Sequence, residues 1–295
     1  MTRSTWIGTG LATALAGGLL LTPLPAHDHA GVFETQRLQS EAIAESSGLV
    51  ASRTHEGVFW THNDSGDEPR IFAINRRGEV LAEVAVLGAQ HQDWEDIAID
   101  DAGHLFLGDI GNNGNQRLDL TVYRVPEPDP HSDAQSVQVD RTLPFRYADQ
   151  VVGRSPPNFD AEALIWHAGA LYLFTKHRAD TQSRLYRLED RAGLDDQVLQ
   201  PLGTLELGAP GMDPDLAQVT AADVSVDGRR IAVLTYGAIH LFGLTGATPW
   251  PLTPIRRIAL DPEEAQQTES IAWDGAALWF GNEQQSLFRL PEPGR

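Results

Sequence analysis

The stretch Trp94-Glu95-Asp96-Ile97-Ala98 is closely followed by the apolar run Leu105-Phe106-Leu107. The same arrangement, a small or acidic residue before an aliphatic one and then a hydrophobic strand, recurs along the chain. The copies begin at Ser47, Glu95, Glu162, Ala222 and Glu269, at steps of 48, 67, 60 and 47 residues. Periods of about 40 to 50 residues with several strands each are typical of propeller blades. We therefore predict an all-β fold, a five-bladed β-propeller.

The two ends of the repeat array are expected to meet. The fifth repeat ends with the strand Leu287–Leu290 and lacks a fourth strand, whereas Val32–Gln39, ahead of the first repeat, alternates like a strand. Pairing these segments would close the ring and remove the exposed sheet edges. In the second and third repeats, the fourth strands are expected at Val137–Tyr147 and Val198–Leu207. A sixth blade hidden in one of the longer intervals is the alternative.

The N-terminal segment has the pattern of a secretory signal peptide. Arg3 precedes an apolar run, and Leu24-Pro25-Ala26 offers a cleavage site. We predict a signal peptide at residues 1–26, a single propeller domain at 27–295, and a periplasmic or extracellular location. A retained membrane anchor is the alternative. Cleavage after Ala26 would place His27-Asp28-His29 at the mature N-terminus, which is either a polar tail or a site suited to Cu2+ or Ni2+.

The composition narrows the range of partners. The chain has no cysteine, so no disulfide stabilises it and a core of adequate size must do so. Its formal net charge of −19 argues against nucleic acids and anionic membrane surfaces, which bind basic patches. We expect a monomer without a membrane anchor that acts on a small molecule. An anionic substrate would need a cation to offset the field of the protein locally.

Three of the five repeats begin with a glutamate, and these glutamates are expected to converge. The innermost strand of a blade starts beside the axial channel, so Glu95, Glu162 and Glu269 should point toward one another. Such close like charges raise one another's pKa unless a cation pairs with them. Ca2+, with oxygen ligands at about 2.3–2.6 Å, is the expected ion. Ser47 would add a hydroxyl or a carbonyl oxygen, and Ala222 only a backbone carbonyl. The alternative is that the glutamates bond to backbone amides without a metal.

A second set of polar residues follows the second strands of the repeats, where loops should converge on one face of the ring. The candidate catalytic residues are Asp64, Asp109 and His177, and the candidate substrate-binding residues are His62, Asn63, Lys176 and Arg178. Lys176 and Arg178 suit a phosphate or carboxylate, and Asp64 or Asp109 would orient water. The alternative for each of these segments is an ordinary polar turn.

These blade starts resemble those of a known family, the calcium-activated nucleotidases or soluble apyrases. The resemblance rests on Glu45–Leu49 (ESSGL), Trp94–Ala98 (WEDIA), Glu162–Leu164 (EAL) with Phe174–Arg178 (FTKHR), and Thr268–Ile271 (TESI). It implies one axial Ca2+ held at Ser47, Glu95, Glu162 and Glu269, while Ala222 departs from the serine of that pattern. The longer sequence segments around these blade starts are similar to those of exported bacterial propellers without assigned activity. A weaker likeness links the chain to calcium-dependent lactonase and gluconolactonase propellers.

The sequence thus predicts an exported, Ca2+-binding propeller that hydrolyses a small phosphorylated substrate. Ester or lactone hydrolysis at the same metal, with His62 or His177 as the base, is one alternative. A non-catalytic binding or scaffold propeller with structural Ca2+ is the other, because propellers host all three functions.

Overall fold

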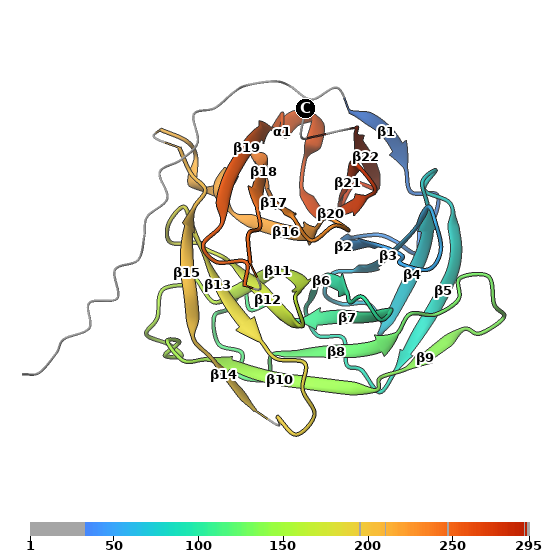
Figure 1. Ribbon diagram of the computed structural model, residues 1–295, viewed down its shortest axis with the longest axis horizontal. Coiled ribbons are helices and arrows are strands. Elements are labelled where there is room, and N and C mark those ends of the chain that lie inside the picture. Colours follow the sequence, from blue (N-terminus) through green and yellow to red (C-terminus); the bar gives the residue numbers. More distant parts are fainter. Residues whose placement is uncertain (1–32, 195, 210, 247, 292, 294–295) are drawn as a thin grey trace, which may run out of the picture.

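The strands of this protein form five separate sheets around a common axis (Figure 1). The structure is a computed structural model that describes residues 33–194, 196–209, 211–246, 248–291 and 293 of the 295-residue chain. The first strands of the five sheets contact one another in a closed circle. The five-bladed, all-β propeller is therefore confirmed, and no sixth sheet exists among the described residues.

Each blade is a mainly antiparallel sheet whose strands run from the axis outward. Blade 1 contains β2 (Ser46–Ala51), β3 (Val58–Asn63), β4 (Arg70–Asn75), β5 (Val80–Leu87) and β9 (Ser136–Gln138). Blade 2 contains β6 (Trp94–Ile99), β7 (His104–Asp109), β8 (Thr121–Pro126), β10 (Arg141–Tyr147) and β14 (Gln197–Leu199). Blade 3 contains β11 (Asp160–His167), β12 (Ala170–Lys176), β13 (Gln182–Leu188) and β15 (Pro201–Glu206).

The last two blades are each introduced by a short helix. The 3-10 helix η1 (Pro214–Ala217) precedes blade 4, and α1 (Pro262–Ala265) precedes blade 5. Blade 4 contains β16 (Val219–Val224), β17 (Arg230–Thr235), β18 (Ala238–Gly243) and β19 (Thr253–Ala259). Blade 5 contains β20 (Thr268–Asp274), β21 (Ala277–Asn282), β22 (Ser286–Leu290) and β1 (Glu34–Arg37).

The ring closes as the sequence predicted. Strand β1 pairs antiparallel with β22, with Glu34 opposite Arg289 and Arg37 opposite Ser286. An ion pair of 2.9 Å between Arg289 Nη1 and Glu34 Oε2 reinforces the register, and in Figure 1 the blue β1 lies beside the dark red β22. The first described strand of the chain thus completes the last blade, so blade 5 has no unpaired outer edge at β22.

The expected fourth strands of blades 2 and 3 are each divided between two blades. The segment predicted as one strand at Val137–Tyr147 begins as β9, which pairs in parallel with β5 of blade 1, and continues as β10 in blade 2. The change occurs between Val139, whose N–H donates to Leu87 O, and Asp140, whose N–H donates to Arg124 O. A regular alternation of side chains does not reveal which sheet supplies the partner, so the sequence could not show this crossing.

The same division occurs in the next blade. The segment predicted as Val198–Leu207 begins as β14, parallel to β10 of blade 2, and resumes as β15 in blade 3. Pro201 starts β15, because a proline has no N–H to donate and is tolerated at the first position of a strand. These two crossings cover the outer edges of blades 1 and 2 and tie each of them to its neighbour.

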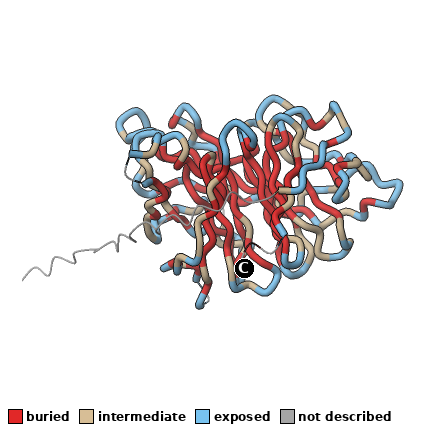
Figure 2. The backbone as a smooth tube through the Cα atoms, turned by 90° about the horizontal axis from the view of Figure 1, so that it is seen from above, coloured by how far each residue is buried: buried red, intermediate tan, exposed pale blue. Residues whose placement is uncertain are grey.

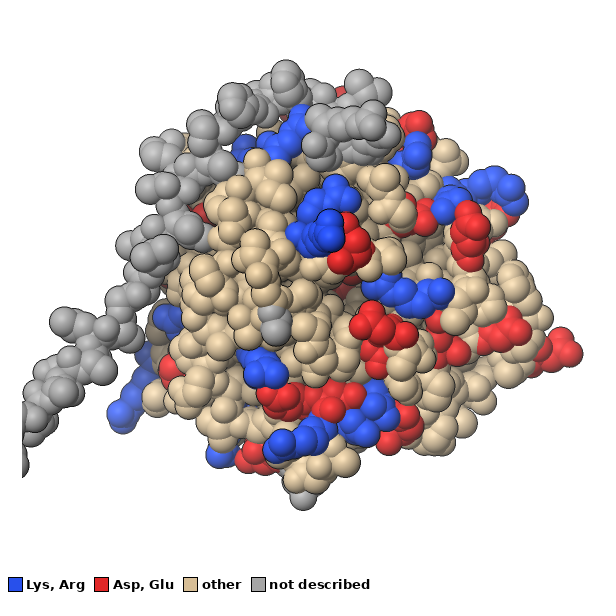
Figure 3. Space-filling view, viewed as in Figure 1, with Lys and Arg blue, Asp and Glu red and all other residues tan. Residues whose placement is uncertain are grey.

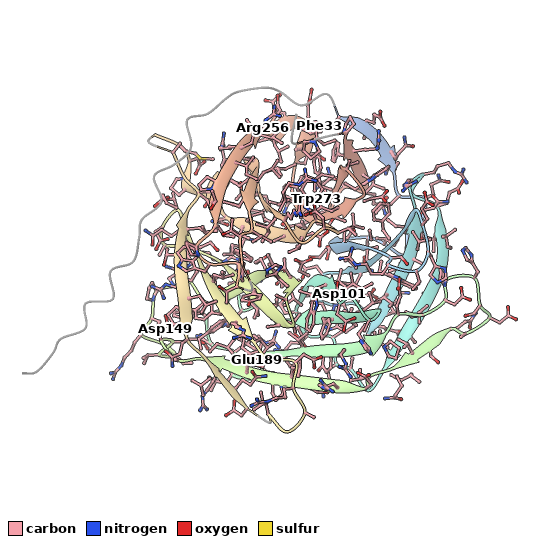
Figure 4. All side chains as sticks on the ribbon, in the orientation of Figure 1. Phe33, Asp101, Asp149, Glu189, Arg256 and Trp273 are labelled. Atoms are coloured by element: carbon pink, nitrogen blue, oxygen red, sulfur yellow. The ribbon has the colours of Figure 1, made fainter. Side chains whose placement is uncertain are left out.

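The core consists of five apolar clusters, each of which lies between two adjacent blades. Buried residues follow the strands through the middle of the disc, and exposed residues gather in the loops at its two faces (Figure 2). Trp166 stacks on Phe106 of blade 2 with ring centroids 5.2 Å apart, and Trp273 is buried between blades 4 and 5. Both tryptophans therefore pack between blades. In Figure 4, Trp273 lies nearer the axis than Phe33 at the rim.

Many surface arginines are paired with carboxylates. On the face shown in Figure 3, basic side chains lie next to acidic ones. Arg124, for example, binds Asp140 at 2.8 Å and Asp190 at 2.8 Å, and Arg141 also binds Asp190. These pairs connect the outer strands of blade 2 with the loop that leaves blade 3.

Several sequence predictions lie outside the described residues. They are the signal peptide at residues 1–26, the mature terminus His27-Asp28-His29, and Val32 at the start of the predicted closing strand. Among the described residues, no helix is long and apolar enough to cross a membrane.

Candidate metal and substrate site

Every innermost strand carries a β-bulge near its start, and the bulge sets which side chain each blade presents at the axis. The extra residue is Glu162 in blade 3 and Glu269 in blade 5, and in blade 2 Glu95 lies within the bulge. The equivalent residues are Gly48 in blade 1 and Thr220 in blade 4. The carboxylates of blades 2, 3 and 5 thus share one structural position, as the repeat predicted.

In the other two blades, the residue predicted from the repeat to occupy this position was wrong. Ser47 pairs with His62 in the regular ladder, one residue before the bulge, and Ala222 pairs with Val233, two residues after it. A bulge inserts a residue on one strand only, so counting along the sequence misses shifts of this size. The Oγ atom of Ser47 donates a 2.6 Å hydrogen bond to the carbonyl of Glu95, which links blades 1 and 2.

Blade 1 contributes no side chain at the bulge position. Gly48 has a φ of +68°, and a Cβ there would lie 2.8 Å from His62 Nε2 and 3.0 Å from the Cα of Asp96. Glycine is therefore required by both the backbone conformation and the close approach of blade 2.

Two overlapping groups of carboxylates lie at the axis. Asp64, Asp93 and Glu95 form one group, and Glu95, Asp160 and Glu162 form the other. Within each group, one ligand oxygen per residue lies within 4.8 Å of the others. Glu95 belongs to both groups and is buried, as are Asp160 and Glu162. Blades 1, 2 and 3 thus bring their carboxylates together on one side of the axis.

Sequence reasoning missed Asp93 and Asp160. Each stands two residues before a predicted ligand, in Asp93-Trp94-Glu95 and Asp160-Ala161-Glu162. Residues i and i+2 of a strand project to the same side, so the Asp-x-Glu spacing in blades 2 and 3 was the available signal.

Glu269 is at the axis but outside both carboxylate groups. Its Oε1 accepts a hydrogen bond of 2.5 Å from the hydroxyl of Tyr236. Lys176 Nζ lies 3.1 Å from that hydroxyl and 3.1 Å from Glu162 Oε1, so it bridges blades 3 and 4. A lysine and a tyrosine therefore stand between Glu269 and the other axial carboxylates.

Arg178 lies at the edge of the same cluster. Its Nη2 atom is 2.6 Å from Asp160 Oδ2 and 3.7 Å from Glu162 Oε1, and it also donates to Asn113 Oδ1. About a third of its side chain is exposed, whereas the side chain of Lys176 is almost fully buried. The two predicted anion-binding residues therefore reach the axial cluster, and both are already paired with carboxylates.

Asp109 contacts residues that adjoin the carboxylate groups. It binds Arg117 Nη1 at 2.9 Å and accepts the backbone N–H of Asp93 at 3.1 Å. The adjoining loop closes over Glu95 at Gly111, where a Cβ would lie 2.1 Å from Glu95 Oε1. The contacts of Asp109 thus position Asp93 and the loop.

The residues of the His62–Asp67 turn make two kinds of contact. Asn63 donates to Ala42 O at 2.8 Å and to Asp67 Oδ2 at 2.6 Å, and it accepts from the backbone N–H of Glu45, so its amide is occupied by the N-terminal segment and the turn. Asp64 instead reaches the axial carboxylates. Of this turn, only Asp64 is placed for chemistry at the axis.

The two candidate histidines lie away from the carboxylate groups. His62 is fully buried, its ring meets Trp94 edge to face at 5.5 Å, and burial lowers its pKa to about 4. His177 is also buried, binds Asp180 Oδ1 at 2.7 Å, and has a pKa lowered mainly by burial. Neither ring belongs to the groups around Glu95.

Burial and mutual repulsion shift the titration of the axial acids. Burial, followed by the charges of Glu162 and Asp64, raises the pKa of Glu95 well above its usual 4.5. Burial likewise raises the pKa of Glu162, against the opposing charge of Lys176. The pKa of Asp93 is raised to about 6 by burial and by Asp64 and Asp160. A further positive charge at this point would therefore be strongly favourable.

Asp96 and Asp223, next to the axis, bind backbone amides of neighbouring blades. Asp96 Oδ2 accepts from the N–H of Leu164 in blade 3 at 2.8 Å and of Ala222 in blade 4 at 3.4 Å. Asp223 Oδ2 accepts from the N–H of Trp273 in blade 5 at 2.7 Å. These acids connect blades instead of facing a ligand.

The comparisons with known proteins concern the fold. No protein-family model and no curated protein matches the chain. A virginiamycin B lyase structure from Staphylococcus aureus is 14% identical, with a TM-score of 0.41 over 83% of this chain and 66% of that chain. A candidate 6-phosphogluconolactonase from Bacteroides uniformis is 16% identical, with a TM-score of 0.38 over 79% and 63%.

A third similar structure is a glucose dehydrogenase, 10% identical, with a TM-score of 0.47 over 87% of this chain and 98% of that chain. The chain spans slightly less than two thirds of the length of the first two structures. At these identities and TM-scores the likeness carries no conclusion about the function of this chain.

Proposed function

We propose that this protein binds Ca2+ at the axial carboxylates and hydrolyses a small phosphorylated substrate there. The observation that carries the proposal is the pair of overlapping carboxylate groups that share Glu95. Ligands bound to one Ca2+ at about 2.4 Å lie at most about 4.8 Å apart, and the oxygens of each group meet that limit. All the donors are hard carboxylate oxygens, the type that Ca2+ prefers. The donor set therefore fits the ion.

The ligands of this proposal differ in part from those expected from the sequence. Glu95 and Glu162 remain as ligands and are joined by Asp160 and Asp93, while Asp64 lies beside them. Glu269 and Ser47 instead hold Tyr236 and the carbonyl of Glu95 in place. When bound, the ion would neutralise the carboxylates and polarise a phosphoryl oxygen of the substrate.

The chain's own residues would supply the rest of the reaction. Arg178, partly exposed beside Asp160, would bind the phosphoryl group, and Lys176 would balance the charge of Glu162 beneath it. Asp64, the carboxylate of the His62–Asp67 turn that reaches the axis, would orient the attacking water. Burial raises the pKa of Asp64. It would take the proton of the water as the new bond to phosphorus forms and the bond to the leaving oxygen breaks.

A binding or scaffold function is the second candidate, and one observation favours it. Lys176 and Arg178 already form ion pairs with Glu162 and Asp160, so a substrate anion would have to compete with these carboxylates. Ester or lactone hydrolysis gains less support, because His62 and His177 lie outside the carboxylate groups.

A substrate panel tests the proposal. Purified protein is assayed with a phosphomonoester, pyrophosphate, a simple ester and a lactone, in Ca2+ and in chelator, after its metal content has been measured. We expect Ca2+-dependent turnover of a phosphorylated substrate, and a fall of about a hundredfold or more in Asp64→Asn. Asp101→Asn, an exposed residue of the turn between β6 and β7, is the control and should keep full activity.

Other outcomes of the panel would support the alternative functions or reject the metal. Bound Ca2+ without turnover of any substrate would support the scaffold, and turnover confined to the lactone or ester would support that alternative. Turnover of a phosphorylated substrate that is equal in Ca2+ and chelator would reject the role of the metal.

We also propose that the protein is exported to the periplasm or beyond the cell. The support is the signal-peptide pattern of residues 1–26. Sequencing the N-terminus of the protein from the extracytoplasmic fraction tests this, and an intact Met1 in protein confined to the cytoplasm would reject it.

A further inference from the structure

We infer that a groove beside the axial cluster binds a hydroxyl-rich ring, such as a sugar, that forms the non-reacting part of the substrate. The inference deepens the proposed function and rests on it for the charged end of the same substrate. The groove has a volume of about 380 Å3, within the range of small-molecule sites, and Asp215, Gln218, Gln266 and Gln267 line it. They come from the η1 and α1 regions that introduce blades 4 and 5.

The groove opens directly from the axial cluster. Arg178 and Tyr236 line it, and both also take part in the axial contacts. Arg178 Nη2 lies 2.6 Å from Asp160, and the Tyr236 hydroxyl lies 3.1 Å from Lys176 Nζ. A molecule whose anionic group is held by Arg178 would therefore extend its remaining part into the groove.

The lining suits hydroxyl groups. Each glutamine amide both donates and accepts hydrogen bonds, and the carboxylate accepts them, so together they can pair with neighbouring hydroxyls in either role. The Gln218 amide is oriented by its bond of 2.8 Å to Asp215 Oδ1. Leu216 and Pro262 supply aliphatic surface for the C–H faces of a ring. Arg178 is the only basic side chain in this lining, which argues against a second phosphate in the groove.

Gln266 provides an independent indication. It caps α1 with φ 56° and ψ −141°, a conformation that glycine adopts easily and that costs free energy for other residues. Gln266 nevertheless lines the groove. Strained positions cluster at ligand sites, so an amide-bearing residue in a glycine-like conformation points to a role for its side chain.

The experiment measures sugar binding to the full chain by ligand-observed NMR. The probes are a panel of pentoses and hexoses, glucose 6-phosphate, and inorganic phosphate, each in Ca2+ and in chelator. The variants are Gln218→Leu, which keeps the volume but loses the amide, and Gln266→Gly, which also relieves the backbone. The control is Ala168→Gly, which relaxes another positive φ, of 47°, in the turn between β11 and β12 and outside the groove.

We expect Gln218→Leu and Gln266→Gly to raise the Kd of the best-binding sugar about tenfold, the worth of one good hydrogen bond. Gln266→Gly should do so without a fall in Tm, whereas Ala168→Gly should leave the Kd unchanged. Inorganic phosphate should bind equally to wild type and to both groove variants, because it does not reach the groove.

The result also separates this inference from the proposed function. If the variants weaken sugar binding in chelator and in Ca2+ alike, the groove is upheld. If Ca2+ at the same time adds nothing to the binding of glucose 6-phosphate, that result counts against the metal alone. Binding of no sugar, or equal Kd values in Gln266→Gly and wild type, would overturn the groove whatever the metal does.

Discussion

The Nζ atom of Lys176 lies 3.1 Å from Glu162 Oε1, and both side chains are buried at the propeller axis. Burial alone would lower the pKa of this lysine, but Glu162 and Glu269 raise it well above its usual value, so the side chain stays charged. The chain contains no other lysine. The protein therefore already carries a buried cation among its axial carboxylates, and the proposed Ca2+ would add to it rather than replace it.

Removing this lysine should separate its structural contribution from metal binding. In Lys176→Met, Glu162 loses its buried partner, and breaking such a pair costs about 3–5 kcal/mol. We expect a Tm several degrees lower in chelator, largely restored by Ca2+, because the metal then meets an uncompensated carboxylate. Arg146→Met, which removes an exposed ion pair with Asp196, is the control and should change little. An unchanged Tm in chelator would contradict the buried-pair argument.

Calcium should stabilise the fold through the carboxylates that share Glu95. At a Ca2+ concentration of about 100 times Kd, linkage predicts a gain of roughly 2.7 kcal/mol, seen as a higher Tm than in chelator at fixed ionic strength. Glu95→Gln keeps the shape and removes the charge common to both groups, so this gain should be lost.

Glu269→Gln distinguishes the two ligand sets. Glu269 occupies the same bulge position but binds Tyr236, so its variant should retain most of the Ca2+-dependent rise in Tm. A loss equal to that of Glu95→Gln would restore the ligand set suggested by the repeat.

Asp96 should stabilise the ring independently of any metal. Its carboxylate accepts the N–H groups of Ile97, Leu164 and Ala222, and Asp96→Ala leaves these buried donors unpaired. We expect a loss of about 3 kcal/mol or more, because each unpaired buried group costs about 1–3 kcal/mol. Chemical denaturation in Ca2+ and in chelator should show the same loss. Asp227→Ala, in an exposed turn, is the control, and an equal effect there would contradict the assignment.

His240 should make the protein less stable in mild acid. Burial, with a smaller effect of Arg257, lowers the pKa of this blade 4 histidine to about 3 from its usual 6.5. Between these values the unfolded chain binds a proton that the folded chain does not, so the free energy of unfolding falls as the pH drops below 6.5. From pH 7 to pH 5 the loss from this group is about 2 kcal/mol.

The variant His240→Phe isolates that contribution, because the axial acids titrate alike in both proteins. Denaturation at pH 7 and pH 5 should show a smaller drop for His240→Phe than for wild type, by about the same 2 kcal/mol. Equal drops in the two proteins would mean that His240 is protonated in the folded state.

Some features of this protein could be read from its sequence alone. The recurrence of a short strand start and an apolar strand predicts five blades, because each blade must repeat the same alternation to pack on its neighbours. The orphan strand before the first repeat predicts the closure seen between Glu34 and Arg289. The glutamates of blades 2, 3 and 5 were also found to share one position, as expected from the repeat.

Only the tertiary structure determined which groups meet at the axis. The bulges place Gly48 and Thr220 where the sequence phase expected Ser47 and Ala222, because an inserted residue changes register without changing the alternation. The approach of Asp64 and Asp160 to Glu95, and of Tyr236 to Lys176, joins residues of different blades. Strand periodicity fixes the side of a sheet to which a side chain points. Its neighbours across the axis depend on how five blades pack, which no local pattern encodes.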